Sequence, residues 1–155
     1  PTIQLMVKEV KANGGIAITA SHNPGEWNAL KLIGGKGTFL DDLEAGELFD
    51  IYNQNDFSPC RESELRTIWQ MDDAFAVHRK RIFDNIDVEA IRKHHFKVAI
   101  DCCNGVGAVY SKAFLQELGC EVYTLNDRPN GIFERIPEPL PENLGALCKL
   151  VKAKK

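Results

Sequence analysis

The stretch KVAIDCCNGVGAVYSKAFLQELGCEVYTL, residues 97–125, contains the pattern that decides the fold. Its apolar runs predict strands at residues 97–101 and 121–125, with a helix at residues 108–118 between them. Gly119 is expected to end that helix, because glycine adopts the left-handed cap conformation at little steric cost. A strand, a helix and a strand in this order form a right-handed crossover with two parallel strands. The sequence therefore predicts an α/β protein.

The segments on either side of this stretch predict further helices and strands. Apolar residues at helical spacing and short apolar runs mark them. We expect helices at residues 3–12, 40–52, 75–86, 87–94 and 142–152, and strands at residues 16–19 and 29–33. The nearly continuous apolar run at residues 16–19 is typical of a strand buried on both faces. Asn13, Gly14 and Gly15 are expected to end the helix before it.

Both halves of the chain therefore have α/β character. We predict two units that join near residue 70, one formed by residues 1–70 and the other by residues 71–155. Each is expected to be an incomplete three-layer α/β unit with a mixed, largely parallel sheet. The chain begins at Pro1 without a leader-like segment, which favours an internal piece of a longer protein.

The composition narrows the classes of partner and compartment. Of 155 residues, 44% are hydrophobic and 26% are charged, with a net charge of −3, which is typical of a globular protein. The negative charge argues against nucleic acid and anionic membranes as partners, and no apolar run is long enough to span a bilayer. The five cysteines include no C-x-x-C pair, so they predict neither a zinc site nor a disulfide framework. A reducing, cytoplasmic location fits this pattern.

The string TASHNP, residues 19–24, follows the first predicted strand. Ligands of open α/β sheets bind beyond the carboxyl ends of strands, which is where Ser21 lies. Taken alone, such a serine more often forms a local turn or a helix cap. A hydrolase nucleophile elbow is not indicated, because that pattern needs glycines where Thr19 and Asn23 stand.

The longer string GGIAITASHNPGEWNALK, residues 14–31, resembles the active-site loop of the α-D-phosphohexomutases, the phosphoglucomutase and phosphomannomutase superfamily. The resemblance continues, in matching order, in KVAIDCCNGVGA at residues 97–108 and PEPLPENL at residues 137–144. It implies a fragment that covers parts of the first two domains of such an enzyme. The parent protein would interconvert hexose 1-phosphate and hexose 6-phosphate through a bisphosphorylated sugar.

The resemblance also implies roles for particular residues. Ser21 would be the phosphoserine, and a Mg²⁺ ion would bind its phosphoryl oxygen, with a hexose 1,6-bisphosphate as activator. His22 and Lys31 match active-site positions, Lys31 being a candidate for general acid–base chemistry or for supplying positive charge. Thr19, Asn23 and Pro24 would bind substrate or shape the loop.

Several parts of the family are not found in this sequence. The resemblance places the other Mg²⁺ ligands, the sugar-recognition loop and the last, phosphate-gripping domain outside it. We therefore expect the chain to be inactive alone. An exposed sheet edge is expected to allow dimerisation.

Two alternatives stay open. NGVGA, residues 104–108, has two glycines of the dinucleotide-binding fingerprint, but Tyr110 occupies the place of the third. A noncatalytic phosphate-binding module is the other alternative.

Overall fold

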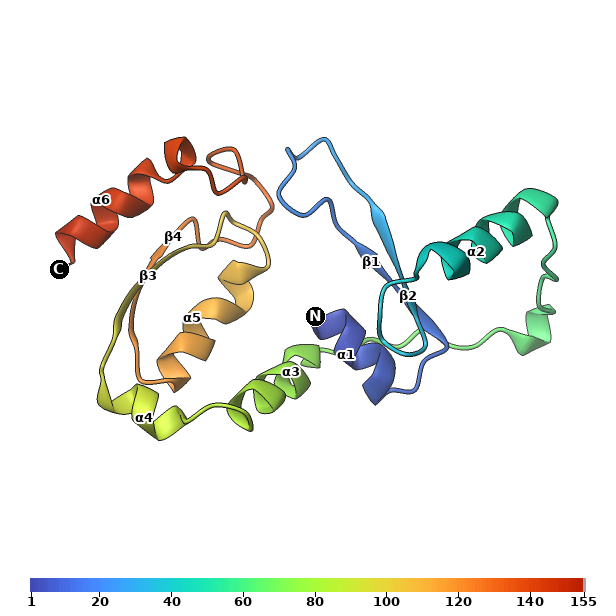
Figure 1. The fold of residues 1–155 in the computed structure, drawn as a ribbon, viewed down its shortest axis with the longest axis horizontal. Coiled ribbons are helices and arrows are strands. Elements are labelled where there is room, and N and C mark those ends of the chain that lie inside the picture. The colour runs from blue at the N-terminus through green and yellow to red at the C-terminus, as the bar shows by residue number, and fades with distance from the viewer. Residues whose placement is uncertain (155) are drawn as a thin grey trace. The chain divides into compact units, whose positions relative to one another are not determined.

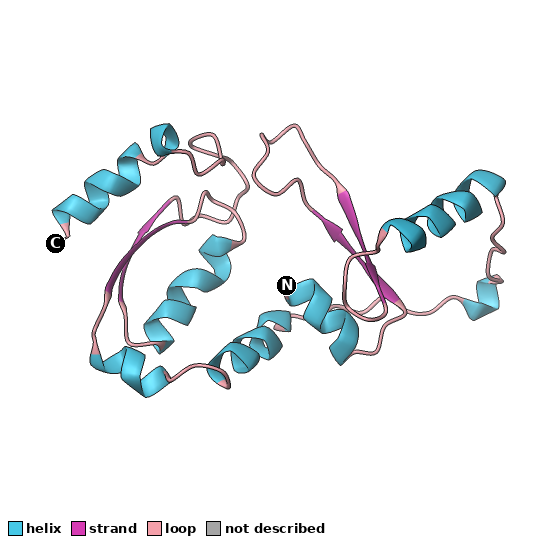
Figure 2. Cartoon of the chain, viewed as in Figure 1, coloured by secondary structure: helices cyan, strands magenta, loops and turns pink. Residues whose placement is uncertain are grey.

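The computed structural model describes residues 1–154, which form helices and small sheets (Figures 1 and 2). The chain divides into two compact units. The first contains Pro1–Ala17 and Leu30–His78, and the second contains Ile18–Ala29 and Arg79–Lys155. The α/β class expected from the sequence is confirmed.

The first unit is built around the strands β1 (Gly14–Ile18) and β2 (Leu30–Gly34), which pair with each other. An antiparallel bridge between Ile33 and Phe39 continues the pairing beyond β2. Helix α1 (Thr2–Glu9) lies against the strands, so that Val7 packs with Ala17 and Ile33 in a small core.

Two features of β1 differ from expectation. Strand β1 is not buried on both faces: Ala17 is buried, whereas Ile16 and Ile18 are 57% and 69% exposed. The glycines do not end α1 either, because Lys11 takes the left-handed conformation with φ 54° and Gly14 and Gly15 belong to the strand. A Cβ at Gly15 would lie 2.6 Å from Cγ2 of Val7, so glycine is required there for α1 to approach the sheet.

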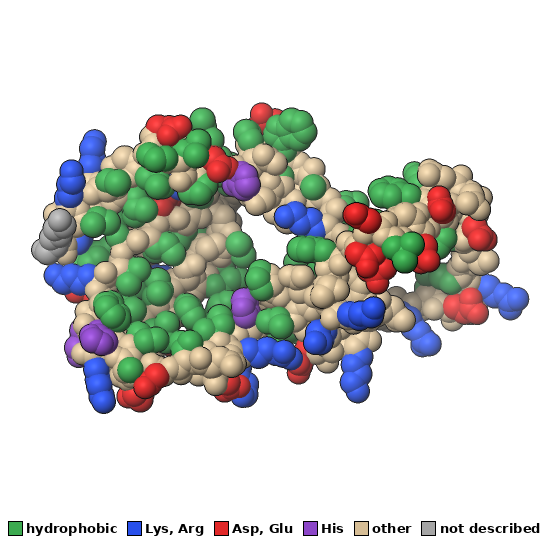
Figure 3. All heavy atoms as spheres, viewed as in Figure 1, with side chains coloured by type: hydrophobic (Ala, Val, Ile, Leu, Met, Phe, Trp, Pro, Cys, Tyr) green, Lys and Arg blue, Asp and Glu red, His purple; other side chains and the backbone are tan. Residues whose placement is uncertain are grey.

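Helix α2 (Asp42–Gln54) follows in the same unit and is capped by the Asp41 side chain, which accepts a hydrogen bond from the backbone N–H of Glu44. Several of its large apolar side chains lie at the surface. Leu43, Phe49 and Tyr52 are 75%, 60% and 73% exposed, and Figure 3 shows apolar and acidic side chains mixed there. A short 3₁₀ helix, η1 (Glu62–Glu64), lies further along the chain.

The second unit contains the parallel pair expected from the sequence. Strands β3 (Lys97–Asp101) and β4 (Glu121–Leu125) pair in parallel from Lys97 with Glu121 to Asp101 with Leu125. Helix α5 (Gly107–Glu117) connects them, and Gly119, with φ 76°, follows its end. The sequence therefore predicted both strands with the bounds that the structure has.

Two helices, α3 (Ala74–Phe83) and α4 (Val88–Lys93), precede β3 in the sequence. Helix α3 leads from the first unit into the second, and α4 begins after its cap, Asp87, whose carboxylate accepts from the backbone N–H of Ala90. The last segment forms a 3₁₀ helix, η2 (Pro141–Asn143), and α6 (Gly145–Ala153), where a single helix was expected. None of the helices in the described part of the chain has the length and apolar character needed to cross a bilayer.

Candidate functional site

The loop at residues 19–29 follows β1, and one hydrogen bond closes its base while another forms a local turn. The backbone N–H of Thr19 donates to the carbonyl of Ala29 at 2.9 Å, while Oγ1 of Thr19 accepts the backbone N–H of Ser21 at 3.0 Å. Within the loop, the N–H of Asn23 donates to the carbonyl of Ala20, and that of Trp27 to the carbonyl of Pro24. These contacts hold the exposed tip, with Ser21, beyond the end of the strand.

Ser21 has a left-handed backbone, with φ 60°. This region is uncommon for residues other than glycine, and strained residues of this kind cluster at functional sites. The conformation is held by the turn through Thr19. An exposed hydroxyl on a strained backbone, just past a strand, is the local geometry expected of a reactive side chain.

His22 lies between Ser21 and Glu138. Its Nδ1 is 3.1 Å from Oγ of Ser21, and its Nε2 is 2.9 Å from Oε2 of Glu138. All three residues belong to the second unit. The imidazole therefore connects the serine hydroxyl to a carboxylate, an arrangement through which a proton can be held near Ser21.

Glu138 is held by its own backbone and by its neighbours. Its carbonyl accepts hydrogen bonds from Nδ2 of Asn143 at 2.8 Å and from the N–H of Leu140 at 2.9 Å. Just before it, Nη1 of Arg135 donates to the carbonyls of Ile136 and Pro137. The segment that presents the carboxylate is thus fixed on both sides.

Arg135 is in turn fixed by Asp101, at the end of β3. Its Nε donates to Oδ2 of Asp101 at 2.7 Å, and Oδ1 of Asp101 accepts from Nδ2 of Asn126 and the backbone N–H of Cys103. Burial by itself raises the pKa of Asp101, but these hydrogen bonds outweigh it, so the pKa lies below its usual value. The same hydrogen bond to Asp101 raises the pKa of Arg135.

Two backbone N–H groups of the turn after β3 are hydrogen-bonded within the second unit. The N–H of Asn104 donates to the carbonyl of Asn126, and that of Gly105 donates to Cys102. The buried side chain of Asn104 bonds to the backbone of Arg128 and Ile132. A dinucleotide-binding turn needs such groups for its pyrophosphate. The N–H groups of Asn104 and Gly105 are therefore already occupied, which argues against that alternative.

The thiols beside this turn are held in their neutral form. Burial raises the pKa of Cys102 and that of Cys103, and the nearby carboxylate of Asp101 raises both further. Cys102 is buried, and a buried free cysteine behaves as a small hydrophobic residue.

The other candidate residue, Lys31, lies half-buried on β2 in the first unit. The structure therefore brings Ser21 and His22 together within one unit, with Thr19, Asn23 and Pro24 in the backbone of the same loop.

Glu138 was missed as a site residue by sequence reasoning. It is far from the loop in sequence, and no local spacing connects the two. The only signal was its place in PEPLPENL, one of the segments that carried the resemblance.

The described residues do not make up a metal site by themselves. Among residues 1–154, no group of three or more His, Cys, Asp or Glu side chains could hold a metal ion. Ser21 offers one oxygen, whereas Mg²⁺ takes near-octahedral oxygen coordination, usually with one or two carboxylates. We therefore derive no chemical step through the ion.

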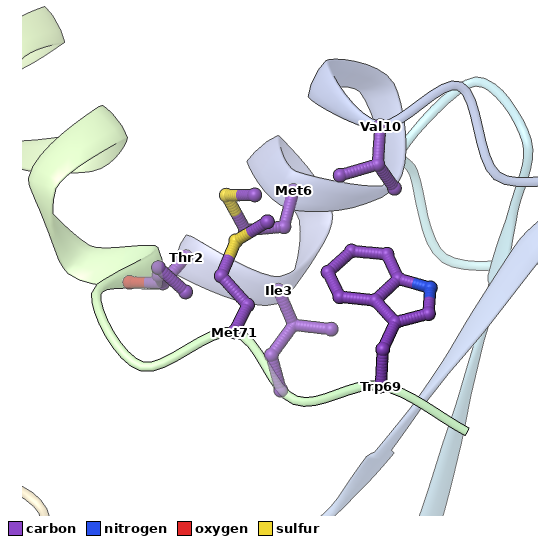
Figure 4. Close-up of a pocket in the computed structure, with 7 residues that line it drawn as sticks. Thr2, Ile3, Met6, Val10, Trp69 and Met71 are labelled. Carbon is purple, nitrogen blue, oxygen red and sulfur yellow. The ribbon is translucent and has the colours of Figure 1, made fainter. Parts of the chain in front are cut away.

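A separate cavity lies in the first unit, with a volume of about 260 Å³. Trp69 and Met71 face Ile3 and Met6 of α1, and Val10 just after its end, across this cavity (Figure 4). Thr2 and Ala74 complete the lining, which has no titratable side chain. The cavity lacks the groups that acid–base or phosphoryl chemistry requires.

Comparisons with known proteins agree with the resemblance seen in the sequence. The family model for phosphoglucomutase/phosphomannomutase, alpha/beta/alpha domain I, matches residues 1–59, and that for domain II matches residues 73–155. The first model ends at Pro59, near the 3₁₀ helix η1, and the second begins at Asp73, just before α3.

The chain is also similar to individual proteins. It is 36% identical to a phosphoglucomutase/phosphomannomutase of Thermococcus kodakarensis, over 99% of this chain and 34% of the relative. It is 32% identical to a phosphoglucosamine/phosphogalactosamine mutase of Sulfurisphaera tokodaii, over 100% of this chain and 34% of the relative. The chain thus spans about a third of the length of these curated relatives.

The fold also matches a solved structure. The crystal structure of a protein assigned as a phosphomannomutase from Thermus thermophilus has a TM-score of 0.81 and 25% identity, over 100% of this chain and 35% of that one. Both family models, the relatives and this structure lead to one assignment. The chain belongs to the phosphoglucomutase/phosphomannomutase family.

Proposed function

We propose that the whole protein interconverts hexose 1-phosphate and hexose 6-phosphate, with Ser21 as the carrier of the phosphoryl group. The observation that carries the proposal is the geometry of Ser21, an exposed serine with φ 60° whose Oγ lies 3.1 Å from Nδ1 of His22. The names of the relatives support the reaction class.

The proposed reaction consists of two phosphoryl transfers. In the first, the bond between Oγ of Ser21 and phosphorus breaks as the free hydroxyl oxygen of the hexose monophosphate loses its proton and bonds to the same phosphorus, and the released serine oxygen takes up a proton. The product is a hexose bisphosphate, which turns round in the site. In the second transfer its other phosphoryl group passes to Ser21, so the serine is phosphorylated again and the isomeric monophosphate leaves.

Two side chains support these steps in the proposal. His22 is within hydrogen-bonding distance of Oγ of Ser21 and is therefore the side chain that faces the serine proton when no phosphoryl group is present. Lys31 would supply positive charge to the transferring group or exchange a proton with the sugar hydroxyl. Thr19, Asn23 and Pro24 would shape the loop.

The cofactors and surroundings belong to the same proposal. A phosphoserine carries about −1.5 to −2 charges, so a cation is expected beside it. We assign Mg²⁺ to that position with most ligands outside residues 1–154, and a hexose 1,6-bisphosphate as activator. The location is proposed to be cytoplasmic, and the partner a phosphorylated hexose rather than nucleic acid or membrane. A second copy of the chain would pair through an exposed edge of a sheet.

Mass spectrometry of the full-length protein tests the carrier. After incubation with glucose 1,6-bisphosphate, peptide mapping is expected to find one phosphoryl group on Ser21. Ser21→Ala should reduce turnover of glucose 1-phosphate, mannose 1-phosphate or glucosamine 1-phosphate to background, because the uncatalysed reaction is extremely slow. Ser58→Ala, an exposed serine in another loop, is the control and should keep activity. Phosphorylation on Thr19 alone, or an active Ser21→Ala protein, would overturn the proposal.

A further inference from the structure

We infer that Glu138 is a positioning residue that holds the His22 imidazole with Nδ1 toward Ser21. The inference rests on the proposed function for its kinetic consequence, but its geometric part stands on the structure. A single imidazole lies between a hydroxyl at 3.1 Å and a carboxylate at 2.9 Å.

The chemistry of the two contacts decides which nitrogen carries hydrogen. An ionised carboxylate only accepts hydrogen bonds, so Nε2 of His22 must donate to Glu138. In the neutral imidazole the proton is then on Nε2, and Nδ1 has a free lone pair. Ser21 consequently donates its hydroxyl proton to Nδ1, which orients an oxygen lone pair of the serine away from the imidazole.

The exposure of His22 and Glu138 indicates that their contact orients the imidazole rather than stabilises the fold. The side chains of His22 and Glu138 are 57% and 34% exposed, and hydrogen-bonded pairs at that exposure contribute little to folding stability. The side chains that anchor the Glu138 segment are more buried than this pair: Asp101 is 3% exposed and Arg135 is 16% exposed. A well-anchored acceptor that adds little stability is suited to orienting its partner.

A continuous series of polar contacts connects Asp101, at the end of β3, to His22 in the loop. Asp101 fixes Arg135, Arg135 donates to the carbonyls just before Glu138, and Asn143 donates to the carbonyl of Glu138 itself. The carboxylate is therefore placed by the hydrogen bonds of Asp101, Arg135 and Asn143, none of which belongs to the TASHNP loop. This arrangement explains how an exposed loop can keep one imidazole orientation.

Nuclear magnetic resonance of the ¹⁵N-labelled chain tests the geometric part without any activity. We expect the ring nitrogen shifts of the neutral His22 imidazole to show hydrogen on Nε2 and a lone pair on Nδ1. Glu138→Ala should move both nitrogen shifts toward the average of an unconstrained imidazole, whereas Glu138→Gln should restore them in part, because its amide oxygen still accepts. Glu134→Ala, an exposed glutamate of the same segment, is the matched control and should change nothing. The inference would be overturned if the neutral imidazole of the unmodified chain carried its hydrogen on Nδ1, or if Glu138→Ala left the ring nitrogen shifts of His22 unchanged.

Kinetics of the full-length protein test the consequence. Glu138→Ala should lower kcat about tenfold, as expected from loss of an orienting hydrogen bond, while KM changes by less than about twofold. Glu138→Gln should recover much of the loss, and Glu134→Ala should behave as the unmodified protein. A rise in KM at unchanged kcat would refute a positioning role.

The two proposals can fail separately. An unmodified protein without mutase activity, combined with His22 shifts that depend on Glu138, would refute the proposed function and leave the inference intact. An active protein in which Glu138→Ala changes neither kcat nor the His22 shifts would refute the inference alone.

Discussion

Arg135 donates a 2.7 Å hydrogen bond from Nε to Oδ2 of Asp101, and this pair joins the end of β3 to the segment that carries Glu138. The Asp101 side chain is only 3% exposed, so its charge depends on the partners around it. A carboxylate in such a position stabilises the fold while it is paired and destabilises it when a partner is removed.

Replacing Arg135 with methionine should lower the stability of the second unit by roughly 3 kcal/mol, because the Asp101 charge would remain buried without its cation. Amide hydrogen exchange of Ala99 and Val122, which lie at adjacent register positions of the β3–β4 pair, measures this without assuming a single unfolding transition. Arg128→Met is the control. Arg128 is exposed, and its hydrogen bond to Asn104 comes from its backbone N–H, which the substitution keeps. Equal protection in the two variants would contradict the role of the pair.

The second unit should lose stability in acid because of Asp101. Its pKa in the folded chain lies below the ordinary value, since its hydrogen bonds outweigh the effect of burial. The stabilisation is therefore fully present above the unfolded pKa of about 3.9 and is lost as the pH falls through the folded pKa. Urea unfolding between pH 5 and pH 2 should show this decline, and Asp101→Asn should flatten it while lowering stability at neutral pH. An unchanged acid slope in Asp101→Asn would show that other carboxylates cause the decline.

Thiol modification should separate the cysteines into two groups. Cys60 and Cys148 are exposed, whereas Cys102 is buried and the pKa values of Cys102 and Cys103 are raised by burial and by Asp101. Because the thiolate is the reactive form, iodoacetamide at neutral pH should label Cys60 and Cys148 first. Peptide mapping over time gives the order, and early labelling of Cys102 would mean that the turn after β3 opens readily.

Lys31→Met in the full-length protein should lower kcat more than it raises KM, if Lys31 acts on the transferring group in the transition state. Methionine keeps much of the length of the side chain and removes its charge. Lys36→Met, at an exposed lysine in the turn after β2, is the matched control. An effect confined to KM would make Lys31 a binding residue only.

The agreement between sequence and structure is best where local patterns suffice. Strands β3 and β4 have the predicted bounds because each is a short apolar run closed by polar or turn residues. The helix predicted at residues 87–94 is found as α4, and Asp87 caps it through a contact with a residue a single turn away.

Burial and long-range contacts were harder to predict. The apolar run of β1 predicted burial on both faces, but periodicity cannot tell which neighbour covers a face, and Ile16 and Ile18 lie exposed. Helix α1 ends before Lys11, which has a left-handed backbone. The sequence reasoning instead assigned this ending to Gly14 and Gly15, of which Gly15 is needed for close packing against Val7. Glu138 reaches His22 only through the tertiary fold, so no spacing in the sequence could indicate the contact.

The left-handed backbone of Ser21 restricts which hydroxyl-bearing amino acid can occupy the position. Threonine has the same hydroxyl, but its branched Cβ makes a φ near 60° a genuine outlier. Thr19, two residues earlier, can have a branched side chain because the positive φ of this turn is at Ser21 and not at Thr19. Serine and threonine are therefore not interchangeable here, even though their oxygens are chemically alike, and the choice between them is made by the main chain.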